Sequence, residues 1–342
     1  MPRVAASIAA MPRWTPDPDR YPRFPLVDGP SPLHRLTRLE SALGGRVRIW
    51  IKREDLLPLA FGGNKLRNLE FLVGAALADG VDTLVTVGRR WSNHARLTAA
   101  AGAKAGLEVH LVLSGPATSP VNPGIQLDEL LGATIHQAVT ADRAERSALL
   151  EAVVGQLRTG GRHVAVIGVG GSGVTGVLGQ VLAAFELADQ AGALGFEPDD
   201  VVVPSATGGT HVGLLVGLRT TDLPTAVHGI AVTPLEEVGP AVARLVEELG
   251  AVDGLARVPS GGIDLDPSQL GGGYGVRTEA ATNAARLLAR TEGILVDPIY
   301  TAKALAGLIE LIRSGRLDGH DVVFWHAGGT PGLFEPLASP AD

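Results

Sequence analysis

The chain has 342 residues, is 45% hydrophobic, carries a formal net charge of −7 and contains no cysteine. This length predicts two domains or one large one, with enough apolar material for a sizeable core. Without cysteine, disulfides, thiolate nucleophiles, zinc–cysteine sites and iron–sulfur clusters are excluded, and we expect no metal. The acidic balance indicates no nucleic acid partner. No run of 18 apolar residues occurs, which indicates no membrane partner, and the lack of a signal-peptide pattern predicts a cytoplasmic location.

Lysine is scarce, because 25 of the 29 basic residues are arginine. Chemistry that needs an amine nucleophile therefore has four candidates: Lys52, Lys65, Lys104 and Lys303. Lys52 alternates with apolar residues and is expected as a charge on an edge strand. Lys104 and Lys303 fall within predicted helices and are expected at the surface.

The first 45 residues, rich in Pro and Arg, are expected to wrap around the surface. From about Arg46 onward, short β-branched runs alternate with longer Ala- and Leu-rich segments, which predicts βαβ units and parallel sheets with helices on both faces. The predicted strands are Val47–Lys52, Thr83–Val87, Val109–Leu113, Thr134–Gln137, His163–Ile167, Val201–Pro204, Ala226–Val232 and Val322–Trp325. The predicted helices are Asn64–Asp79, Ser92–Ala105, Gln126–Leu131, Ala141–Arg158, Val174–Gly192, His211–Arg219, Leu235–Leu249, Glu279–Thr291 and Thr301–Ser314.

More than one sheet is expected, because Lys65 to Gly170 alone holds roughly four such units. Gly and Pro concentrate at Pro116–Gly124 and Pro259–Gly275. The second stretch is long enough to be a functional loop.

The first candidate site is Phe-Gly-Gly-Asn-Lys at 61–65, which opens a predicted helix. Two glycines let the backbone approach a flat ligand, Asn64 is a good N-cap, and Lys65 projects from the first turn. Burial and the helix dipole lower the pKa of an amine there and make it a better nucleophile toward a carbonyl. The alternative is a solvated lysine on an exposed turn.

The second candidate is Gly-Arg-Arg-Trp-Ser-Asn-His at 88–94, between a strand and a helix. Open α/β sheets bind ligands at the carboxyl ends of their strands. There the first-turn amides, with Ser92, Asn93 and His94, suit a carboxylate. Simple capping by Ser92 is the alternative, but three successive polar residues exceed what capping requires.

The third candidate is Ser-Ala-Thr-Gly-Gly-Thr-His at 205–211, again between a strand and a helix. Its small residues expose successive N–H groups, an arrangement that binds phosphate at a helix N-terminus. Because the Gly-Lys-Ser/Thr ending of a nucleotide P-loop is absent, a compact monophosphate fits better than a triphosphate.

The segment 168–173, Gly-Val-Gly-Gly-Ser-Gly, matches G-x-G-x-x-G. A dinucleotide fingerprint also needs an acidic residue about 20 positions further on, at the end of the next strand. Glu186 and Asp189 instead fall inside a predicted helix, which argues against a nicotinamide cofactor.

Two of the three tyrosines lie in Gly- or Pro-containing loops near the C-terminus, Tyr274 in 271–275 and Tyr300 in 297–301. The third such loop, 326–330, is His-Ala-Gly-Gly-Thr. Each tyrosine has a structural alternative, in which its ring packs and its hydroxyl bonds to backbone. Two of three in such loops favour a ligand contact by at least one.

An amine, a monophosphate cradle and a carboxylate nest together point to pyridoxal phosphate and a small amino acid substrate. Seven motifs in this order resemble the 1-aminocyclopropane-1-carboxylate (ACC) deaminase and D-cysteine desulfhydrase family from Leu33 to Phe334. They are Lys-Arg-Glu-Asp at 52–55, Gly-Gly-Asn-Lys at 62–65, Ser-Asn-His at 92–94, Thr-Gly-Gly-Thr at 207–210, Gly-Tyr-Gly at 273–275, Asp-Pro-x-Tyr-Thr at 297–301 and Gly-Gly-Thr-Pro at 328–331.

The resemblance implies an α/β fold of type II (tryptophan synthase β-like), with two open, twisted, mostly parallel sheets covered by helices on both faces. It also implies a large cofactor-binding domain from 1–67 and 171–342, a small domain at 68–170 inserted in it, and a homodimer.

The resemblance further assigns roles. Lys65 would bear the cofactor, Asn93 would contact its phenolic oxygen, and Ser92 and His94 would hold the substrate carboxylate, with Ser92 also helping proton transfers. Tyr274 would lie beside the substrate and Tyr300 against the cofactor ring. The remaining expected cofactor contacts are Thr207, Gly208, Gly209, Thr210 and Thr301, and the remaining expected substrate contacts are Asn93, Trp91 and Arg90.

The chain departs from the family at Asn68, where a second lysine is usual, and at Ala327, where a threonine usually follows the histidine. Residues 89–91, Arg-Arg-Trp, replace a small residue, Ile and Gln. Arg89 or Arg90 is a candidate to recognise a second anionic group such as a sulfonate, phosphonate or distal carboxylate. The alternative is that these arginines face solvent or structural carboxylates.

Thr301 bears on the reaction, because the deaminase has a glutamate after the equivalent tyrosine to keep the pyridine nitrogen protonated. A neutral threonine favours α,β-elimination to a 2-oxo acid and ammonia, as in the desulfhydrase, over ring opening. The alternatives are β-replacement, ACC-deaminase-type ring opening, and a cofactor-binding homologue without turnover.

Overall fold

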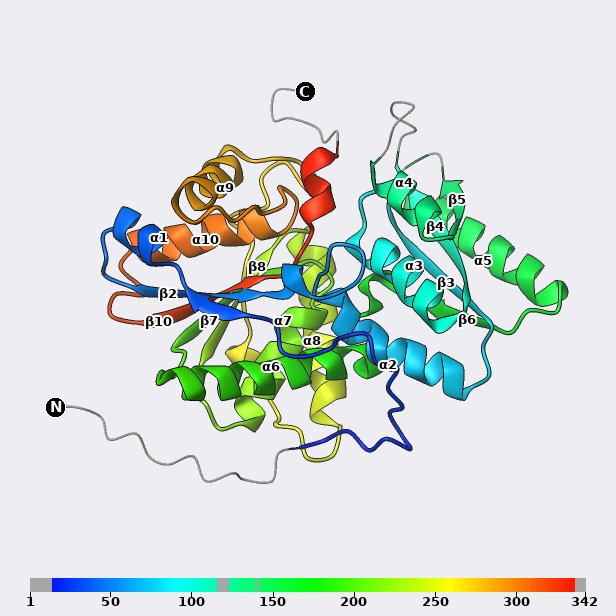
Figure 1. Cartoon of the computed structure of the whole chain (residues 1–342), viewed down its shortest axis with the longest axis horizontal. Coiled ribbons are helices and arrows are strands. Elements are labelled where there is room, and N and C mark those ends of the chain that lie inside the picture. The colour runs from blue at the N-terminus through cyan, green and yellow to red at the C-terminus, as the bar shows by residue number, and fades with distance from the viewer. Residues whose placement is uncertain (1–13, 116–122, 139, 141, 336–342) are drawn as a thin grey trace.

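The computed structural model describes residues 14–115, 123–138, 140 and 142–335, and these form two open sheets (Figure 1). The larger sheet has the order β1-β2-β10-β7-β8-β9, in which β1 is antiparallel to β2 and every other neighbouring pair is parallel. Its strands are β1 (Leu33–Arg35), β2 (Arg48–Arg53), β7 (Asp200–Ser205), β8 (Ala226–Ala231), β9 (Asp264–Asp266) and β10 (Asp321–His326).

Helices cover both faces of this sheet, α1, α9 and α10 on one and α6, α7 and α8 on the other (Figure 1). Because successive side chains of a strand point to opposite faces, Phe324 packs in the core beneath α9 and α10, while Trp325 packs beneath α6 and α7. The helices are α1 (Thr37–Ala42), α6 (Val174–Leu194), α7 (Gly209–Thr220), α8 (Leu235–Gly250), α9 (Glu279–Glu292) and α10 (Thr301–Arg313).

The smaller sheet is entirely parallel, in the order β5-β4-β3-β6, and all its strands lie between residues 83 and 167. Helices α2, α3 and α4 pack on one face and α5 on the other. Its elements are α2 (Lys65–Ala78), β3 (Thr83–Arg89), α3 (Asn93–Ala105), β4 (Glu108–Ser114), α4 (Pro123–Leu130), β5 (Thr134–Ala138), α5 (Arg143–Thr159) and β6 (Val164–Ile167). The boundaries of an inserted small domain at 68–170 stay a prediction.

The predicted strands and helices all occur, and the sequence-based prediction missed β1, α1 and β9. Each of these is short, and β1 is held by long-range pairing, His34 with Ile51, rather than by a local pattern. The first 45 residues therefore do more than wrap the surface. Residues 1–13 and most of Pro116–Gly124 lie outside the described residues. Short 3₁₀ helices complete the chain at Glu54–Leu56, Val169–Gly171, Ser260–Gly262 and Thr330–Phe334.

Two lysine predictions are wrong. Lys52 lies on β2 inside the sheet and is fully buried, where it pairs with Glu186 of α6 and donates to the Ser31 carbonyl at 2.7 Å. Lys303 is also fully buried, and it donates to two carbonyl oxygens of the 270–273 loop. Partners distant in sequence supply both environments, so the local pattern did not reveal them. Lys104 is exposed, as predicted.

Candidate active site

An open pocket of about 640 Å³, counting its mouth, lies where strands of both sheets end. Its wall comes from the segments that follow the carboxyl ends of β2, β3, β6, β7 and β10, together with two loop tyrosines. This is the edge at which open α/β sheets bind ligands. The lining residues are Asn64, Lys65, Ser92, Asn93, His94, Val169, Gly170, Pro204, Ala206, Thr207, Gly208, Gly209, Thr210, Tyr274, Tyr300, Ala327 and Gly328.

All three sequence-predicted candidate segments therefore contribute to one pocket. Three of the predicted site residues, Arg90, Trp91 and Thr301, do not line it. The predicted residues that do are Lys65, Ser92, Asn93, His94, Thr207, Gly208, Gly209, Thr210, Tyr274 and Tyr300.

The turn before Lys65 requires glycine. Gly62 has φ +64°, and a Cβ there would lie 2.4 Å from the Asp55 carbonyl oxygen. Asn64 follows with helical backbone angles and makes no side-chain cap, contrary to its predicted N-cap role. Its Nδ2 instead donates to Thr210 Oγ1 at 2.6 Å, so this side chain joins the start of α2 to the start of α7.

Lys65 is the first residue of α2, and its amine has an altered proton affinity. Burial lowers the pKa of Lys65 to about 8. At pH 7 about a tenth of the amine is then unprotonated, far more than for an ordinary lysine, and the unprotonated form is the one that attacks a carbonyl.

Arg96 sets the orientation of Asn93, and sequence reasoning missed it. Its Nη1 donates to Asn93 Oδ1 at 2.8 Å, while its other nitrogens donate to the carbonyl oxygens of Ala60 and Gly62. Because the Asn93 oxygen is occupied, the amide NH₂ is the group left to donate into the pocket. Arg96 thereby links Asn93 to the turn that carries Lys65.

The start of α3 offers donors for an anion. Ser92 is the N-cap, and its Oγ accepts from Ala95 N at 3.2 Å, which leaves the hydroxyl hydrogen free to donate elsewhere. The main-chain N–H groups of Asn93 and His94 belong to the first turn, where no intrahelical acceptor exists. Together these groups suit a carboxylate.

The His94 side chain is an acceptor. Thr86 Oγ1 lies 2.8 Å from the Ile167 carbonyl oxygen and 3.0 Å from His94 Nε2. Two oxygens that close need a proton between them, so the threonine donates to Ile167 and His94 Nε2 carries the hydrogen toward Thr86. Burial and the nearby Lys65 lower the pKa of His94 to about 3, so the ring is neutral and Nδ1 is unprotonated. Nδ1 is buried and has no partner among the described residues.

The start of α7 forms a cradle of uncapped amides. Gly208 precedes the helix with φ +80° and makes no side-chain cap, so the first-turn N–H groups are free for a ligand. A side chain at Gly209 would crowd the loop, because a Cβ there would lie 2.7 Å from Ser172 Oγ. Two hydroxyls border the cradle, Thr207 Oγ1, 2.6 Å from Ser172 Oγ, and Thr210 Oγ1. A compact phosphate matches this arrangement.

Tyr274 and Tyr300 share a hydrogen bond between their hydroxyls. Burial raises the pKa of both tyrosines, so both are neutral phenols at physiological pH. Asp297 positions Tyr300, because its buried carboxylate accepts from the main-chain N–H groups of residues 299, 300 and 301. The Thr301 hydroxyl donates to the same carboxylate, which explains why Thr301 lies behind the pocket wall.

Arg90 and Trp91 lie behind the wall as well. Arg90 is buried, its Nε is 4.0 Å from Glu335 Oε2, and its guanidinium stacks 5.4 Å from the centre of the Trp91 ring. Trp91 in turn packs against Tyr274, with ring centres 6.2 Å apart, and against Gly275. Trp91 therefore supports the tyrosine side of the pocket from outside.

The Gly-rich segment 168–173 does belong to the site, through Val169 and Gly170. Its glycines reflect close packing, since a Cβ on Gly170 would lie 2.6 Å from Thr207 Oγ1. Glu186, weighed above as a ribose ligand, instead binds Lys52 and Arg67 at a distance from the pocket lining. The G-x-G-x-x-G match was thus a sequence signal for this wall, and not for a dinucleotide.

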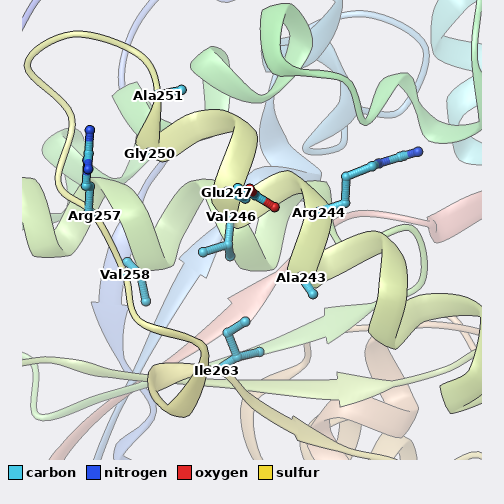
Figure 2. A pocket seen from close by; sticks show the side chains of 9 residues that line it. All are labelled: Ala243, Arg244, Val246, Glu247, Gly250, Ala251, Arg257, Val258 and Ile263. Atoms are coloured by element: carbon cyan, nitrogen blue, oxygen red, sulfur yellow. The ribbon is translucent and has the colours of Figure 1, made fainter.

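A second, larger pocket lies between α8 and the segment that follows it (Figure 2). Val246, Val258 and Ile263 form its apolar part, and Arg244, Glu247 and Arg257 are its charged residues. It contains none of the predicted site residues, so the chemistry belongs to the first pocket.

An amine of lowered pKa, an uncapped amide cradle and glycine-lined walls thus occur in one pocket. They fit a phosphate-bearing aldehyde cofactor that a lysine attacks, which is the chemistry of pyridoxal phosphate. None of the helices in the described ranges is both long and apolar enough to cross a bilayer.

Comparison with known proteins agrees with this geometry. The family model described as "Pyridoxal-phosphate dependent enzyme" matches residues 25–328. D-cysteine desulfhydrases from Salmonella choleraesuis (strain SC-B67) and Salmonella paratyphi C (strain RKS4594) are 41% and 40% identical over 321 residues, which cover 92% of this chain and 96% of theirs.

Solved structures show the same fold. The crystal structure of an ACC deaminase homologue superposes with a TM-score of 0.82 at 34% identity, covering 93% of this chain and 94% of that one. The processed form of threonine deaminase isoform 2 from Solanum lycopersicum shares the fold, with a TM-score of 0.65 at 18% identity and coverage of 89% and 80%. The chain therefore belongs to the family of pyridoxal-phosphate-dependent enzymes, as a fold-type II member homologous to the D-cysteine desulfhydrases.

Proposed function

We propose that this enzyme catalyses α,β-elimination on a small amino acid, releasing a 2-oxo acid and ammonia as a D-cysteine desulfhydrase does. The observation that carries the proposal is the single pocket that combines the Lys65 amine, the amide cradle at Gly208–Thr210 and the donor nest at Ser92–His94. We also propose, from the family resemblance, a cytoplasmic homodimer.

Each residue group has one part in holding the cofactor. Lys65 would hold its aldehyde carbon, the amides and hydroxyls of Thr207–Thr210 would bind its phosphate, and the Asn93 NH₂ would donate to its phenolic oxygen. Tyr300 lies against its ring. When bound, pyridoxal phosphate supplies an electron sink that makes the substrate α-proton acidic.

The start of α3 binds the substrate carboxylate. Because the His94 ring presents an acceptor, the contact from this residue comes from its main-chain N–H, alongside that of Asn93 and the Ser92 hydroxyl. A carboxylate at this helix N-terminus also gains from the helix dipole.

The reaction then needs a proton acceptor and a leaving group. The neutral Lys65 Nζ, or Ser92 Oγ, takes the α-proton, and the β-substituent leaves with the electron pair of its bond to Cβ. Water hydrolyses the unsaturated amino acid that results, and the products are a 2-oxo acid and ammonium. Tyr274, a neutral phenol hydrogen-bonded to Tyr300, is placed to donate a proton to the departing group.

Thr301 supports elimination over ring opening of a cyclopropane. Its hydroxyl is held by Asp297, and no carboxylate among the described residues lines the pocket. The described pocket lining thus offers no acidic partner to keep the pyridine nitrogen protonated, which favours a reaction that needs a less powerful electron sink.

The test is a spectrum recorded with an amino acid panel. Purified enzyme should absorb visible light from its cofactor, and Lys65→Ala should lose that absorbance. When D-cysteine or β-chloroalanine is supplied as the substrate, ammonia and the 2-oxo acid should be released together. Capture of an added nucleophile without ammonia would instead indicate β-replacement, and a bound cofactor with no product from any amino acid would indicate a homologue without turnover. A colourless protein that cannot be loaded with pyridoxal phosphate would refute the proposal.

A further inference from the structure

Two arginines from different elements meet at the end of β3. Arg89 is the last residue of β3 and pairs in register with Ser114 of β4. Arg146, on α5, donates from Nη1 to Ser114 Oγ at 3.2 Å, and that hydroxyl donates to the Gly88 carbonyl at 3.4 Å. The two arginines, called the Arg89–Arg146 pair below, are 57 positions apart in sequence and both partly exposed.

Positive charge is in surplus around this pair. Burial, followed by the charges of Arg89 and Arg143, lowers the pKa of Arg146. The carboxylate of Glu237 acts in the opposite direction on Arg146, and it lies 3.8 Å from Arg143. The internal residues outside the described ranges, 116–122, 139 and 141, carry no charged side chain that could neutralise the rest. Like charges held together in this way are unfavourable until an anion joins them.

The pair lies beside the tyrosine side of the pocket. The positive charge of Arg89 acts to lower the pKa of Tyr274 and of Tyr300, against the larger effect of burial, so its electrostatic effect reaches both tyrosines. Tyr274 also acts to raise the pKa of Arg146. The Arg89 carbonyl accepts from Ser92 N at 2.8 Å, so the main chain of Arg89 adjoins the carboxylate nest.

Arg90, the other arginine that the sequence singled out, faces a different environment. It is buried, lies near Glu335 and stacks on Trp91. Arg90 therefore belongs to the packing behind the pocket wall, and Arg146 is the second cation that lies beside Arg89, just outside the residues that line the pocket.

Resting on the proposed function, we propose that the Arg89–Arg146 pair is a subsite for a negatively charged group on the substrate side chain. Guanidinium groups are weakly hydrated forks that match sulfonate, phosphate and carboxylate oxygens. With a β-sulfonate as the example, the α-proton is removed, the C–S bond breaks with its electron pair on sulfur, and sulfite leaves. Addition of water then yields pyruvate and ammonium, with no external oxidant or reductant.

Three amino acids test the three anions: cysteate, O-phosphoserine and S-carboxymethylcysteine, each as both enantiomers. S-carbamoylmethylcysteine is the neutral isostere of the last, and β-chloroalanine is a small neutral substrate. The variants are Arg89→Gln and Arg146→Gln. Arg158→Gln is the matched control, because it removes the same charge from an exposed position at the far end of α5.

In the wild type, kcat/KM for at least one anionic substrate should exceed that for a neutral one by about tenfold or more, as one charge-assisted contact provides. Each pair variant should lower that ratio by about tenfold, whereas Arg158→Gln should not change it. Arg158→Gln should keep the wild-type rate with β-chloroalanine. Equal ratios in wild type and both pair variants would overturn the subsite while leaving the proposed function intact.

A binding measurement keeps the subsite testable if no amino acid is turned over. 3-Sulfopropanoate has both anionic groups but no amine, so it binds without reacting. Calorimetry on the cofactor-loaded enzyme should show its Kd raised about tenfold in Arg89→Gln and unchanged in Arg158→Gln. An unchanged Kd in both pair variants, with their thermal unfolding as in wild type, would exclude the subsite.

Discussion

Thr86 Oγ1 and His94 Nε2 lie 3.0 Å apart, and this contact decides which ring nitrogen of His94 carries the proton. Since Thr86 donates to Ile167, His94 must donate to Thr86, and its buried Nδ1 is an acceptor with no partner among the described residues. His94, which the sequence predicts as a carboxylate-binding residue, thus has a neutral ring whose orientation is fixed by Thr86 of β3.

Thr86→Val tests this relationship. The change leaves the Ile167 carbonyl and the His94 N–H without partners inside the protein, so we expect a loss of about 1–3 kcal/mol in the free energy of unfolding. Thr86→Ser retains the hydroxyl and should cost less. Urea unfolding of both variants measures the difference, and a valine variant as stable as the wild type would show that the tautomer is set otherwise.

The rate of cofactor loading should depend on pH through Lys65. Only the unprotonated amine attacks the cofactor aldehyde, and its pKa is about 8 in the folded chain. We therefore expect the loading rate of cofactor-free enzyme to rise about tenfold per pH unit below pH 8 and to level off above it. Stopped-flow absorbance between pH 7 and 10 follows the reaction. A rate still rising at pH 10 would mean an ordinary lysine pKa and contradict the effect of burial.

Gly208→Ala should weaken cofactor binding. The residue has φ +80°, and a Cβ there would lie 2.6 Å from Val242 Cγ2, so the loop must shift and misplace the phosphate-binding amides. We expect the Kd for pyridoxal phosphate to rise about tenfold or more, since left-handed backbone alone costs a non-glycine residue about 1–2 kcal/mol. Gly173→Ala is the control, because it has φ −97° and open space around it. Equal Kd values in the two variants, measured by equilibrium dialysis, would count against the cradle.

A charged histidine outside the pocket should make stability fall at alkaline pH. His228 on β8 lies 2.6 Å from Asp200 through Nε2 and 2.6 Å from Asp264 through Nδ1. Burial lowers its pKa, but the two hydrogen-bonded carboxylates outweigh this and raise the pKa to about 9. Because the folded pKa exceeds the unfolded value of about 6.5, this contribution is complete below pH 6.5 and is lost as pH rises through 9.

The measurement is the free energy of unfolding of wild type and His228→Gln between pH 6 and 10. The difference between the two proteins should be largest near pH 6 and shrink toward pH 10. A difference that stays constant across this range would show that His228 is not charged in the folded chain.

Local pattern and topology were enough to predict the three main segments that meet at the pocket, although Arg90, Trp91 and Thr301 do not line it. Alternating apolar strands and helices predict parallel sheets, and the carboxyl ends of parallel strands meet at one edge. Lys65, Ser92–His94 and Thr207–Thr210 each follow such a strand end, so their convergence could be expected before the fold was known.

Only the tertiary structure shows the charge of these side chains, their orientation and the neighbours that hold them in place. Lys52 and Lys303 are buried by partners far along the chain, Arg96 orients Asn93, and Arg146 rather than Arg90 accompanies Arg89. Local periodicity reports which face of an element is apolar, but it does not report which element packs there. Burial, tautomer and charge balance depend on that packing, so no local pattern could predict them.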